Sequence, residues 1–93
     1  MRLSNEEIKL IKKTINSHLP STIYIFGSQL DDNKKGGDLD LYLIPKKYPN
    51  DIDIKIGLIR IILEERLMLP VDIIIAKDEN RAIEIEAKKG IKI

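Results

Sequence analysis

The sequence has no cysteine, and its aromatic residues are limited to one phenylalanine and three tyrosines among 93 residues. The absence of cysteine excludes a disulfide framework and a thiolate metal site, which fits a cytoplasmic protein. Charged residues also interrupt every apolar run well before about 18 residues, so we expect neither a signal peptide nor a membrane-spanning helix.

An excess of either charge is also missing. Sixteen lysines and arginines stand against fifteen aspartates and glutamates, which leaves a net charge of +1. Proteins that hold nucleic acid or anionic membranes through a broad field need a marked excess of positive charge. We therefore expect no direct nucleic-acid binding and no membrane binding, and any anionic ligand must be held locally by a few groups.

The length and the patterns along the chain predict one small domain of mixed class. With 43% hydrophobic residues, positions 1–93 suffice for a single domain with a modest core. Ser4 and Glu7 are spaced as a capping box, which predicts that a helix begins there. Apolar periodicity and Pro positions predict alternating elements and hence an α/β fold: helices over 4–18, 51–68 and 79–89, and strands over 22–26, 38–44 and 71–76.

The expected helix over 51–68 is apolar on two sides. At about 100° per residue, one side carries Ile52, Ile56, Ile59, Leu63 and Leu67, and roughly the opposite side carries Ile54, Leu58 and Ile61. Large exposed apolar patches are rare, so we expect the second side to pack on another helix of this chain. The alternative is that it packs on a partner.

Two aspartates open the strand over 38–44. Because side chains alternate along a strand, Asp38 and Asp40 share one face and Leu39, Leu41 and Leu43 share the other. Carboxylates about 7 Å apart repel one another unless a cation lies between or beside them. Asp72 interrupts the apolar strand over 71–76, and it joins the other two carboxylates if that strand pairs beside 38–44.

A cluster of three carboxylates is the kind of site that Mg²⁺ requires, since this ion takes oxygen ligands and commonly links carboxylates to substrate phosphates. Gly27 and Ser28 follow the first strand and could bind the phosphates that such a metal ion links to the carboxylates. Glycine lets the backbone approach an anion closely, and the serine hydroxyl and the amides of a short following helix can bind phosphate.

Other interpretations of these residues remain open. Asp38 and Asp40 could be a solvated strand end beside a Gly-Gly turn. Asp72 could pair with a buried arginine such as Arg60 or Arg66. The loop residues Lys34 and Lys35 are most simply solvated, with the alternative that they steer a triphosphate.

Gly27-Ser28, nine intervening residues, Asp38-x-Asp40 and the later Asp72 together resemble the signature of the DNA polymerase beta-like nucleotidyltransferase superfamily, specifically its minimal nucleotidyltransferase branch. The resemblance implies a small mixed β-sheet flanked by helices, with two Mg²⁺ ions in the active site. It implies that Asp38 and Asp40 bind both metals, that Asp72 binds the catalytic metal and helps to deprotonate the acceptor hydroxyl, and that Gly27 and Ser28 bind the β- and γ-phosphates of ATP or another nucleoside triphosphate.

The chain departs from the pattern of this family at two places. Gln29-Leu30 stands where many relatives have a basic residue followed by a small one, and Gly37 replaces a common serine. Both departures concern the binding of phosphate and leave the three expected metal ligands intact.

The resemblance also implies a partner. A domain of this length has little surface left for an acceptor site or a nucleobase clamp. In the resembled branch a helical HEPN-type toxin often completes the site, and the nucleotidyltransferase neutralises this ribonuclease as an antitoxin by transferring AMP from ATP to a tyrosine. The two-sided helix over 51–68 fits such a partner or a homodimer. The alternatives are a non-catalytic antitoxin that masks its partner and a small-molecule nucleotidyltransferase, which is disfavoured because no acceptor-binding domain is visible.

Overall fold

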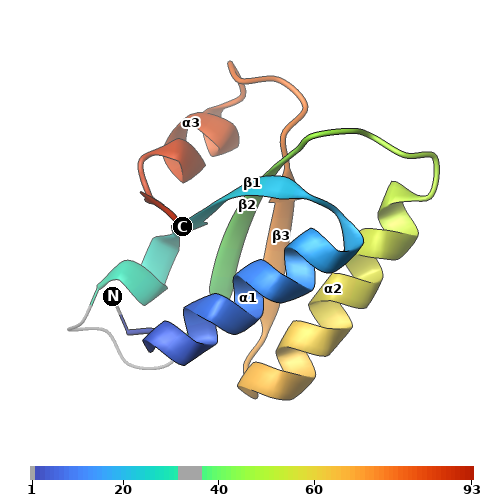
Figure 1. Ribbon diagram of the computed structural model, residues 1–93. Coiled ribbons are helices and arrows are strands. Elements are labelled where there is room, and N and C mark those ends of the chain that lie inside the picture. The colour runs from blue at the N-terminus through green and yellow to red at the C-terminus, as the bar shows by residue number, and fades with distance from the viewer. Residues whose placement is uncertain (1, 32–36) are drawn as a thin grey trace.

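A four-stranded mixed sheet organises the chain in the computed structural model, which describes residues 2–31 and 37–93 (Figure 1). The strand order is β3-β2-β1-β4, in which β1 is antiparallel to β2 and β4, and β2 is parallel to β3. The elements in chain order are α1 (Asn5–His18), β1 (Ser21–Phe26), the 3₁₀ helix η1 (Gly27–Leu30), β2 (Leu39–Pro45), α2 (Ile52–Leu67), β3 (Val71–Ile75), α3 (Ala82–Lys88) and β4 (Ile91–Lys92). This arrangement confirms the expected α/β (α+β) class and the small mixed sheet flanked by helices.

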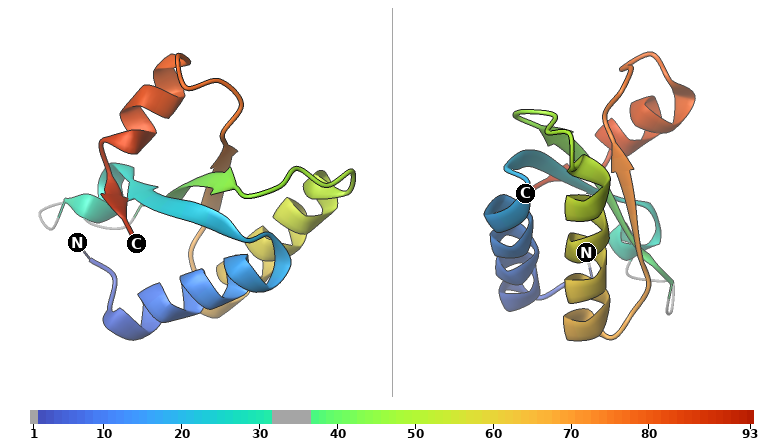
Figure 2. Two further views of the ribbon diagram at one scale, coloured as in Figure 1. Left: turned by 45° about the horizontal axis from the view of Figure 1, so that its top comes forward. Right: turned by 90° about the vertical axis from the view of Figure 1, so that its right-hand side faces the viewer.

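Helices α1 and α2 lie side by side on one face of the sheet, as Figures 1 and 2 show. The alternating leucines of β2 point to this face, and Leu39, Leu41 and Leu43 are fully buried there. Ile11 and Ile15 of α1 and Ile59 and Leu63 of α2, each pair at helical spacing, complete the core. The opposite face carries the aspartates, and α3 covers one end of it.

The capping box at the start of α1 forms as predicted. The Glu7 amide donates to Ser4 Oγ over 3.1 Å, and the Ser4 amide donates to Glu7 Oε1 over 2.8 Å. Two amides that have no partner within the helix are thereby satisfied. The expected start of the last helix is wrong by three residues, because residues 77–81 form a loop whose amides bind the Glu84 side chain.

The expectation that the second side of α2 packs on another helix of this chain is wrong. Ile54 is 67% exposed, Leu58 46% and Ile61 58%, whereas Ile59 and Leu63 on the other side are fully buried. Helix α1 lies beside α2 on the same layer, and it does not cover this side. In the described residues, no helix has both the length and the apolar character that crossing a membrane needs.

Candidate active site

The register of two neighbouring strands brings two of the three expected aspartates together. Asp40 of β2 is the direct partner of Asp72 in the parallel strand β3. Neighbouring strands lie about 4.8 Å apart, and paired residues of parallel strands point to the same face. Asp38 precedes β2 by one residue, is exposed, and stands two positions before Asp40. These strand positions place the three aspartates at the same end of the sheet.

The electrostatics of Asp40 reflect this gathering. Partial burial raises the pKa of the Asp40 carboxyl, and the charges of Asp72 and Asp38 raise it further, Asp72 more than Asp38. A proton relieves this accumulation of negative charge, and so does a cation. The environment of Asp40 therefore favours the binding of positive charge.

Gly27 lies where the end of β1 meets the start of β2. Its φ is +81°, and a Cβ built on it would stand 2.3 Å from Asp40 Oδ2. Only glycine satisfies both constraints, because other residues avoid positive φ and their Cβ would collide with the carboxylate. The expected phosphate-binding segment consequently touches the expected metal ligands through its backbone.

Ser28 explains one departure from the family pattern. Gly37 has a φ of +94°, and a Cβ on it would stand only 2.6 Å from Ser28 Oγ. A serine at position 37 would therefore need a different backbone conformation and a displaced Ser28 hydroxyl. In this chain Gly37 and Ser28 form a matched pair.

The other departure concerns the basic residue that is missing after Ser28. Gln29, which stands at that position, is a buried neutral amide and therefore does not replace the missing positive charge. Arg2 brings a cation to the same segment: its Nη2 donates to the carbonyl oxygen of Ser28 over 3.1 Å, and its backbone amide donates to that of Gln29 over 3.0 Å. The buried Arg2 Nε makes no hydrogen bond.

Sequence reasoning missed Arg2. The residue lies 26 positions before Ser28 and precedes the first helix, so no local motif connects it with the loop. The only indication in the sequence was that no basic residue follows Ser28, so that a cation at this segment has to come from elsewhere in the chain.

Glu84 is a second residue that sequence reasoning missed. Its side chain is fully buried, and it accepts hydrogen bonds from Tyr42 Oη over 2.7 Å, from the amides of Lys77 and Asp78 over 3.0 and 2.9 Å, and from Arg81 Nη1 over 3.1 Å. Burial alone raises the pKa of this carboxyl, but the hydrogen bonds and the charge of Arg81 outweigh burial and lower the pKa to about 2.

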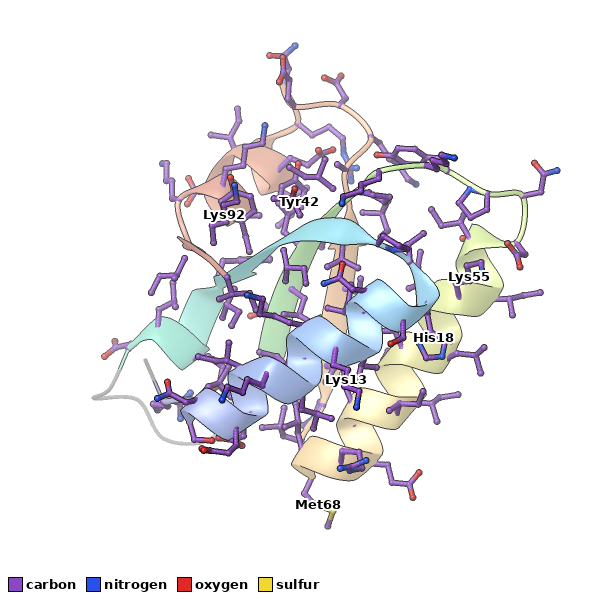
Figure 3. The ribbon with its side chains drawn as sticks, in the orientation of Figure 1. Lys13, His18, Tyr42, Lys55, Met68 and Lys92 are labelled. Carbon is purple, nitrogen blue, oxygen red and sulfur yellow. The ribbon has the colours of Figure 1, made fainter. Side chains whose placement is uncertain are left out.

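Glu84 connects α3 to the strand that carries the aspartates. Tyr42 follows Asp40 by two positions on the same face of β2, and Figure 3 shows it between the sheet and α3. Burial and the hydrogen bond to Glu84 raise the pKa of the Tyr42 hydroxyl well above its usual range, so this hydroxyl remains a donor. The Tyr42–Glu84 hydrogen bond thus holds α3 against β2, the strand that carries Asp40.

The donor set suits Mg²⁺, because it consists of carboxylate oxygens on one face beside a backbone segment that can approach an anion. Yet in residues 2–31 and 37–93 no group of three or more acidic, histidine or cysteine side chains gathers closely enough to hold an ion. The strand register brings together the backbones of Asp40 and Asp72. Asp38, Asp40 and Asp72 are the residues that would hold the metal.

The structure tests one of the alternative roles for these aspartates and leaves the solvated strand end open, because Asp38 is exposed. Arg60 and Arg66, proposed as buried partners of Asp72, are both exposed, so that interpretation is wrong. Asp72 takes part in none of the ion pairs within the described ranges. Lys34 and Lys35 lie outside the described residues.

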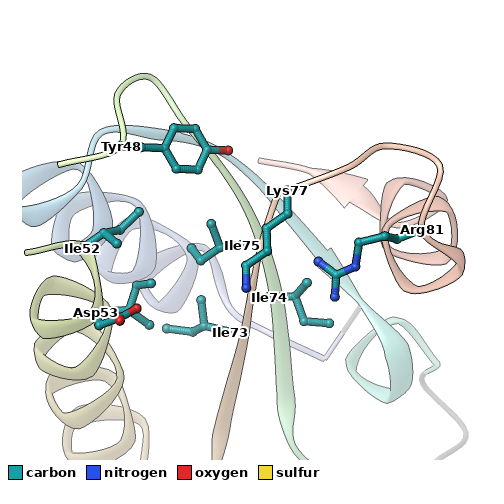
Figure 4. A pocket seen from close by; sticks show the side chains of 9 residues that line it. Tyr48, Ile52, Asp53, Ile73, Ile74, Ile75, Lys77 and Arg81 are labelled. Atoms are coloured by element: carbon teal, nitrogen blue, oxygen red, sulfur yellow. The ribbon is translucent and has the colours of Figure 1, made fainter. Parts of the chain in front are cut away.

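A cavity of about 440 Å³ lies beside β3, beyond Asp72 along the strand (Figure 4). Ile73, Ile74 and Ile75 form its floor, and Tyr48, Lys77 and Arg81 stand around it. Figure 4 shows the Arg81 guanidinium pointing toward Ile74. The cavity does not include the three aspartates, so it adjoins the candidate site and is not its centre.

Comparisons with known proteins add no family assignment. No protein-family model matches the chain, and neither a curated protein nor a solved structure is significantly similar to it. The function of the chain must therefore be inferred from the geometry of the aspartates, the glycine-serine segment and the residues that hold them.

Proposed function

We propose that the chain is a Mg²⁺-dependent nucleotidyltransferase of the minimal nucleotidyltransferase branch, which transfers a nucleoside monophosphate, AMP from ATP in the first place, to a hydroxyl acceptor. The observation that carries this proposal is the register of Asp40 opposite Asp72, with the backbone of Gly27 against the Asp40 carboxylate. Carboxylates and a close-approaching backbone are the two halves that a metal-bound triphosphate needs.

Each residue has a role in this proposal. Asp38, Asp40 and Asp72 would hold the metal ions, with Asp72 on the catalytic one. Gly27 and Ser28 bind the β- and γ-phosphates. Bound Mg²⁺ supplies Lewis-acid stabilisation of the charge on the attacking and departing oxygens.

The acceptor oxygen forms a bond to the α-phosphorus, and the bond between that phosphorus and the bridging oxygen to the β-phosphorus breaks. Pyrophosphate leaves, and Asp72 takes the proton of the acceptor hydroxyl. We propose a tyrosine of a helical HEPN-type toxin as the acceptor, which makes the chain an antitoxin. The small size of the chain supports this choice, because a domain of this length has little surface left to build an acceptor site of its own.

The test is transfer of label from α-³²P-ATP with Mg²⁺ to a HEPN-type protein encoded beside this chain. We expect label on the partner with the wild-type chain and none with Asp40→Asn or Asp72→Asn. The matched control is Glu6→Gln, an equivalent loss of charge at an exposed site on α1, which should transfer at the wild-type rate. Failure of the wild-type chain to label the partner with Mg²⁺ or Mn²⁺ refutes the enzymatic proposal.

A second candidate function is a binding antitoxin that masks its partner without chemistry. The observation in its favour is that no metal-binding group gathers in the part of the chain that the structure describes. Asp40→Asn separates the two candidates in a growth assay with the toxin. Neutralisation survives this substitution if binding suffices, and it is lost if transfer is required.

A further inference from the structure

Strand β3 forms one edge of the sheet, so one side of its backbone has no neighbouring strand. The Pro70 carbonyl oxygen accepts from an amide of β2 over 2.9 Å, and the Ala76 amide donates to a carbonyl oxygen of β2 over 2.9 Å. Backbone groups of successive residues point to opposite sides of a strand, and every second residue between these two therefore also faces β2. The amides and carbonyls of Ile73 and Ile75 consequently point away from the sheet.

The two ends of this free edge are closed, and its middle is open. At the start of β3, the Val71 amide donates to Glu64 Oε2 over 2.9 Å. Just after the strand, Tyr48 Oη donates to the next backbone carbonyl oxygen. Between them, the outward amides and carbonyls of Ile73 and Ile75 have no hydrogen-bond partner within residues 2–31 and 37–93. Such a row of donors and acceptors is the template on which an extended peptide adds a strand.

The cavity of about 440 Å³ lies along this free edge. Figure 4 shows Ile73 and Ile75 pointing toward Ile52 of α2, and Ile74 pointing away from it toward Arg81. All three isoleucines of β3 remain partly exposed. Edge strands that stay unpaired commonly carry charged residues, proline or a bulge. Three consecutive isoleucines are instead typical of an edge that is paired.

The position of Asp72 indicates what an added strand carries. Directly opposed residues of neighbouring strands point to the same face, so a residue opposite Ile74 lies on the face of Asp40 and Asp72. Diagonal neighbours on that face are about 7–8 Å apart, a separation that an aromatic side chain spans. A tyrosine opposite Ile74 can therefore rest its ring on Ile74 and bring its hydroxyl to the Asp72 carboxylate. A serine or threonine at the same position is too short.

A second copy of this chain does not supply such a tyrosine. The two edges of its described sheet are β3 and β4. Neither strand contains a serine, a threonine or a tyrosine. Pairing of two copies through these edges would thus bring no acceptor hydroxyl to Asp72, whereas a segment of a different protein can.

We propose that the acceptor segment of the partner binds as an added strand on the free edge of β3, with its acceptor tyrosine opposite Ile74. The inference rests on the proposed function and deepens it, because it says where the acceptor binds. The tyrosine oxygen attacks the α-phosphorus of the bound nucleotide, its proton passes to Asp72, and pyrophosphate leaves. The residues on either side of the tyrosine face the wall of Ile52, Ile73 and Ile75, where apolar side chains fit.

Amide hydrogen exchange by NMR tests where the segment binds, with the ¹⁵N-labelled full chain and the HEPN-type protein encoded beside it. The Ile73 and Ile75 amides should exchange at least about 10-fold more slowly when the partner is present, because each gains a hydrogen bond. The Ile74 amide already faces β2 and is the internal control, which should change little. Metal and nucleotide are left out, so the result does not depend on catalysis.

The outcomes of this experiment separate the inference from the proposed function. Transfer of label to the partner without slower exchange at Ile73 and Ile75 overturns the inference and leaves the proposed function standing. Slower exchange at both amides without transfer of label supports the docking on β3 and refutes only the catalytic step. Slower exchange caused by Mg²⁺-ATP alone, or by a higher concentration of this chain alone, assigns the edge to a nucleotide or to a second copy and overturns the inference.

A proline on the edge tests the hydrogen bonds directly. Ile73→Pro removes an outward amide and no bond to β2, which is the situation in which edge strands tolerate proline. It should lower transfer to the partner at least about 5-fold, as expected for one lost hydrogen bond, and leave the affinity for Mg²⁺-ATP unchanged. The matched control is Lys92→Pro on β4. The Ile93 amide donates to the Ile23 carbonyl oxygen of β1, so the Lys92 amide points outward at the opposite edge.

Transfer should be unchanged in Lys92→Pro, and an equal loss in both proline variants contradicts the inference. If circular dichroism shows that Ile73→Pro does not fold, the exchange experiment on the wild type decides. Disulfide trapping tests the register, because the chain has no cysteine of its own. Ile74→Cys should be trapped by a partner whose only cysteine replaces the acceptor tyrosine, and Ile75→Cys, which points to the other face, should not. Equal trapping at both positions overturns the proposed register.

Discussion

Gly27 lies directly against the carboxyl group of Asp40, where a Cβ would stand 2.3 Å from Oδ2. The contact joins the end of β1 to the start of β2, whose residues Phe26 and Asp40 are partners in the antiparallel ladder. The glycine-serine segment and the aspartates therefore form one unit, and a change to either should be felt by the other.

Gly27→Ala should destabilise the protein by about 2–4 kcal/mol, because alanine is disfavoured at positive φ and its Cβ collides with the carboxylate. Urea denaturation of the four proteins in a double-mutant cycle with Asp40→Ala measures the effect. Removing the Asp40 carboxyl leaves only the Asp40 Cβ, at 3.5 Å. In the Asp40→Ala background, Gly27→Ala should therefore destabilise the protein less than in the wild type, by at least about 1 kcal/mol. An equal cost in both backgrounds would show that the contact does not matter.

Asp40→Asn should stabilise the folded protein at neutral pH in the presence of a chelator. Burial and the charges of Asp72 and Asp38 raise the pKa of Asp40, so the folded state disfavours the ionised carboxyl. The contribution of Asp40 to stability is complete below its ordinary pKa of 3.8 and is lost as the pH rises through the raised value. Solvent screens this partly exposed group, so we expect about 0.5 kcal/mol, or roughly 2–4 °C in Tm at pH 7.

Thermal melts from pH 3 to pH 8 check this expectation. The gain in Tm should disappear as the pH falls below the ordinary pKa of aspartate, where the wild-type carboxyl is protonated in both states. Asp72 acts on Asp40 more strongly than Asp38 does, so Asp72→Asn should raise Tm more than Asp38→Asn. If Asp40→Asn has a lower Tm than the wild type at pH 7, the ionised Asp40 carboxyl is not destabilised by its burial and by the charges of Asp72 and Asp38.

Local patterns in the sequence predicted most of the elements and which strand faces are buried. The alternation of Leu39, Leu41 and Leu43 with polar residues correctly predicted which side of β2 is buried. The pairing of β3 beside β2 was a condition of the site hypothesis, and the register of Asp40 with Asp72 meets it. These features depend on side-chain periodicity and on the short connections of a small domain, both of which are visible in the sequence.

Long-range contacts between polar side chains were not visible in the sequence. Tyr42 and Glu84 are 42 residues apart, and nothing in the pattern around Glu84 distinguishes a buried acceptor from a solvated acid on a helix. Arg2 likewise meets Ser28 only because η1 passes beside the start of the chain. The exposed side of α2 was misjudged for a different reason, since a single sequence does not say whether an apolar face is covered by its own chain or by another.

Arg2 should support nucleotide binding as a positioning residue. Its guanidinium donates to the Ser28 carbonyl, which fixes the segment proposed to bind phosphate, and it brings a charge that Gln29 does not supply. Hydrogen bonds from charged groups contribute about 1.5–3 kcal/mol, so Arg2→Ala should weaken binding of Mg²⁺-ATP at least 10-fold in calorimetry. Arg2→Lys should retain part of the affinity, because lysine keeps the charge but not the planar fork.

Lys12→Ala is the matched control, because it removes the same charge from an exposed position on α1. AMP binding provides a second comparison. Since Ser28 is assigned to the β- and γ-phosphates, Arg2→Ala should affect ATP more than AMP. Equal losses for Arg2→Ala and Lys12→Ala would reduce the role of Arg2 to general electrostatics.

Glu84→Gln should destabilise the protein at neutral pH and alter its response to acid. The carboxylate is fully buried among four donors, so an amide leaves donors facing donors, and breaking a buried ionic contact of this kind costs about 3 kcal/mol. Because the folded state lowers the pKa of Glu84 to about 2 from an ordinary value of 4.5, its contribution is complete above the ordinary pKa. It is lost as the pH falls from that value toward 2.

Urea denaturation at pH 7, pH 4 and pH 2.5 separates Glu84 from the other acids. The difference between the wild type and Glu84→Gln should be largest at pH 7 and should narrow on acidification. Tyr42→Phe, which removes one of the donors to this charged group, should cost about 1.5–3 kcal/mol. Glu86→Gln breaks an exposed pair with Lys89 and should change stability by less than about 0.5 kcal/mol. If the wild type and Glu84→Gln lose stability in parallel as the pH falls, the buried carboxylate is not what holds α3 and the loop at residues 77–81 beside Tyr42.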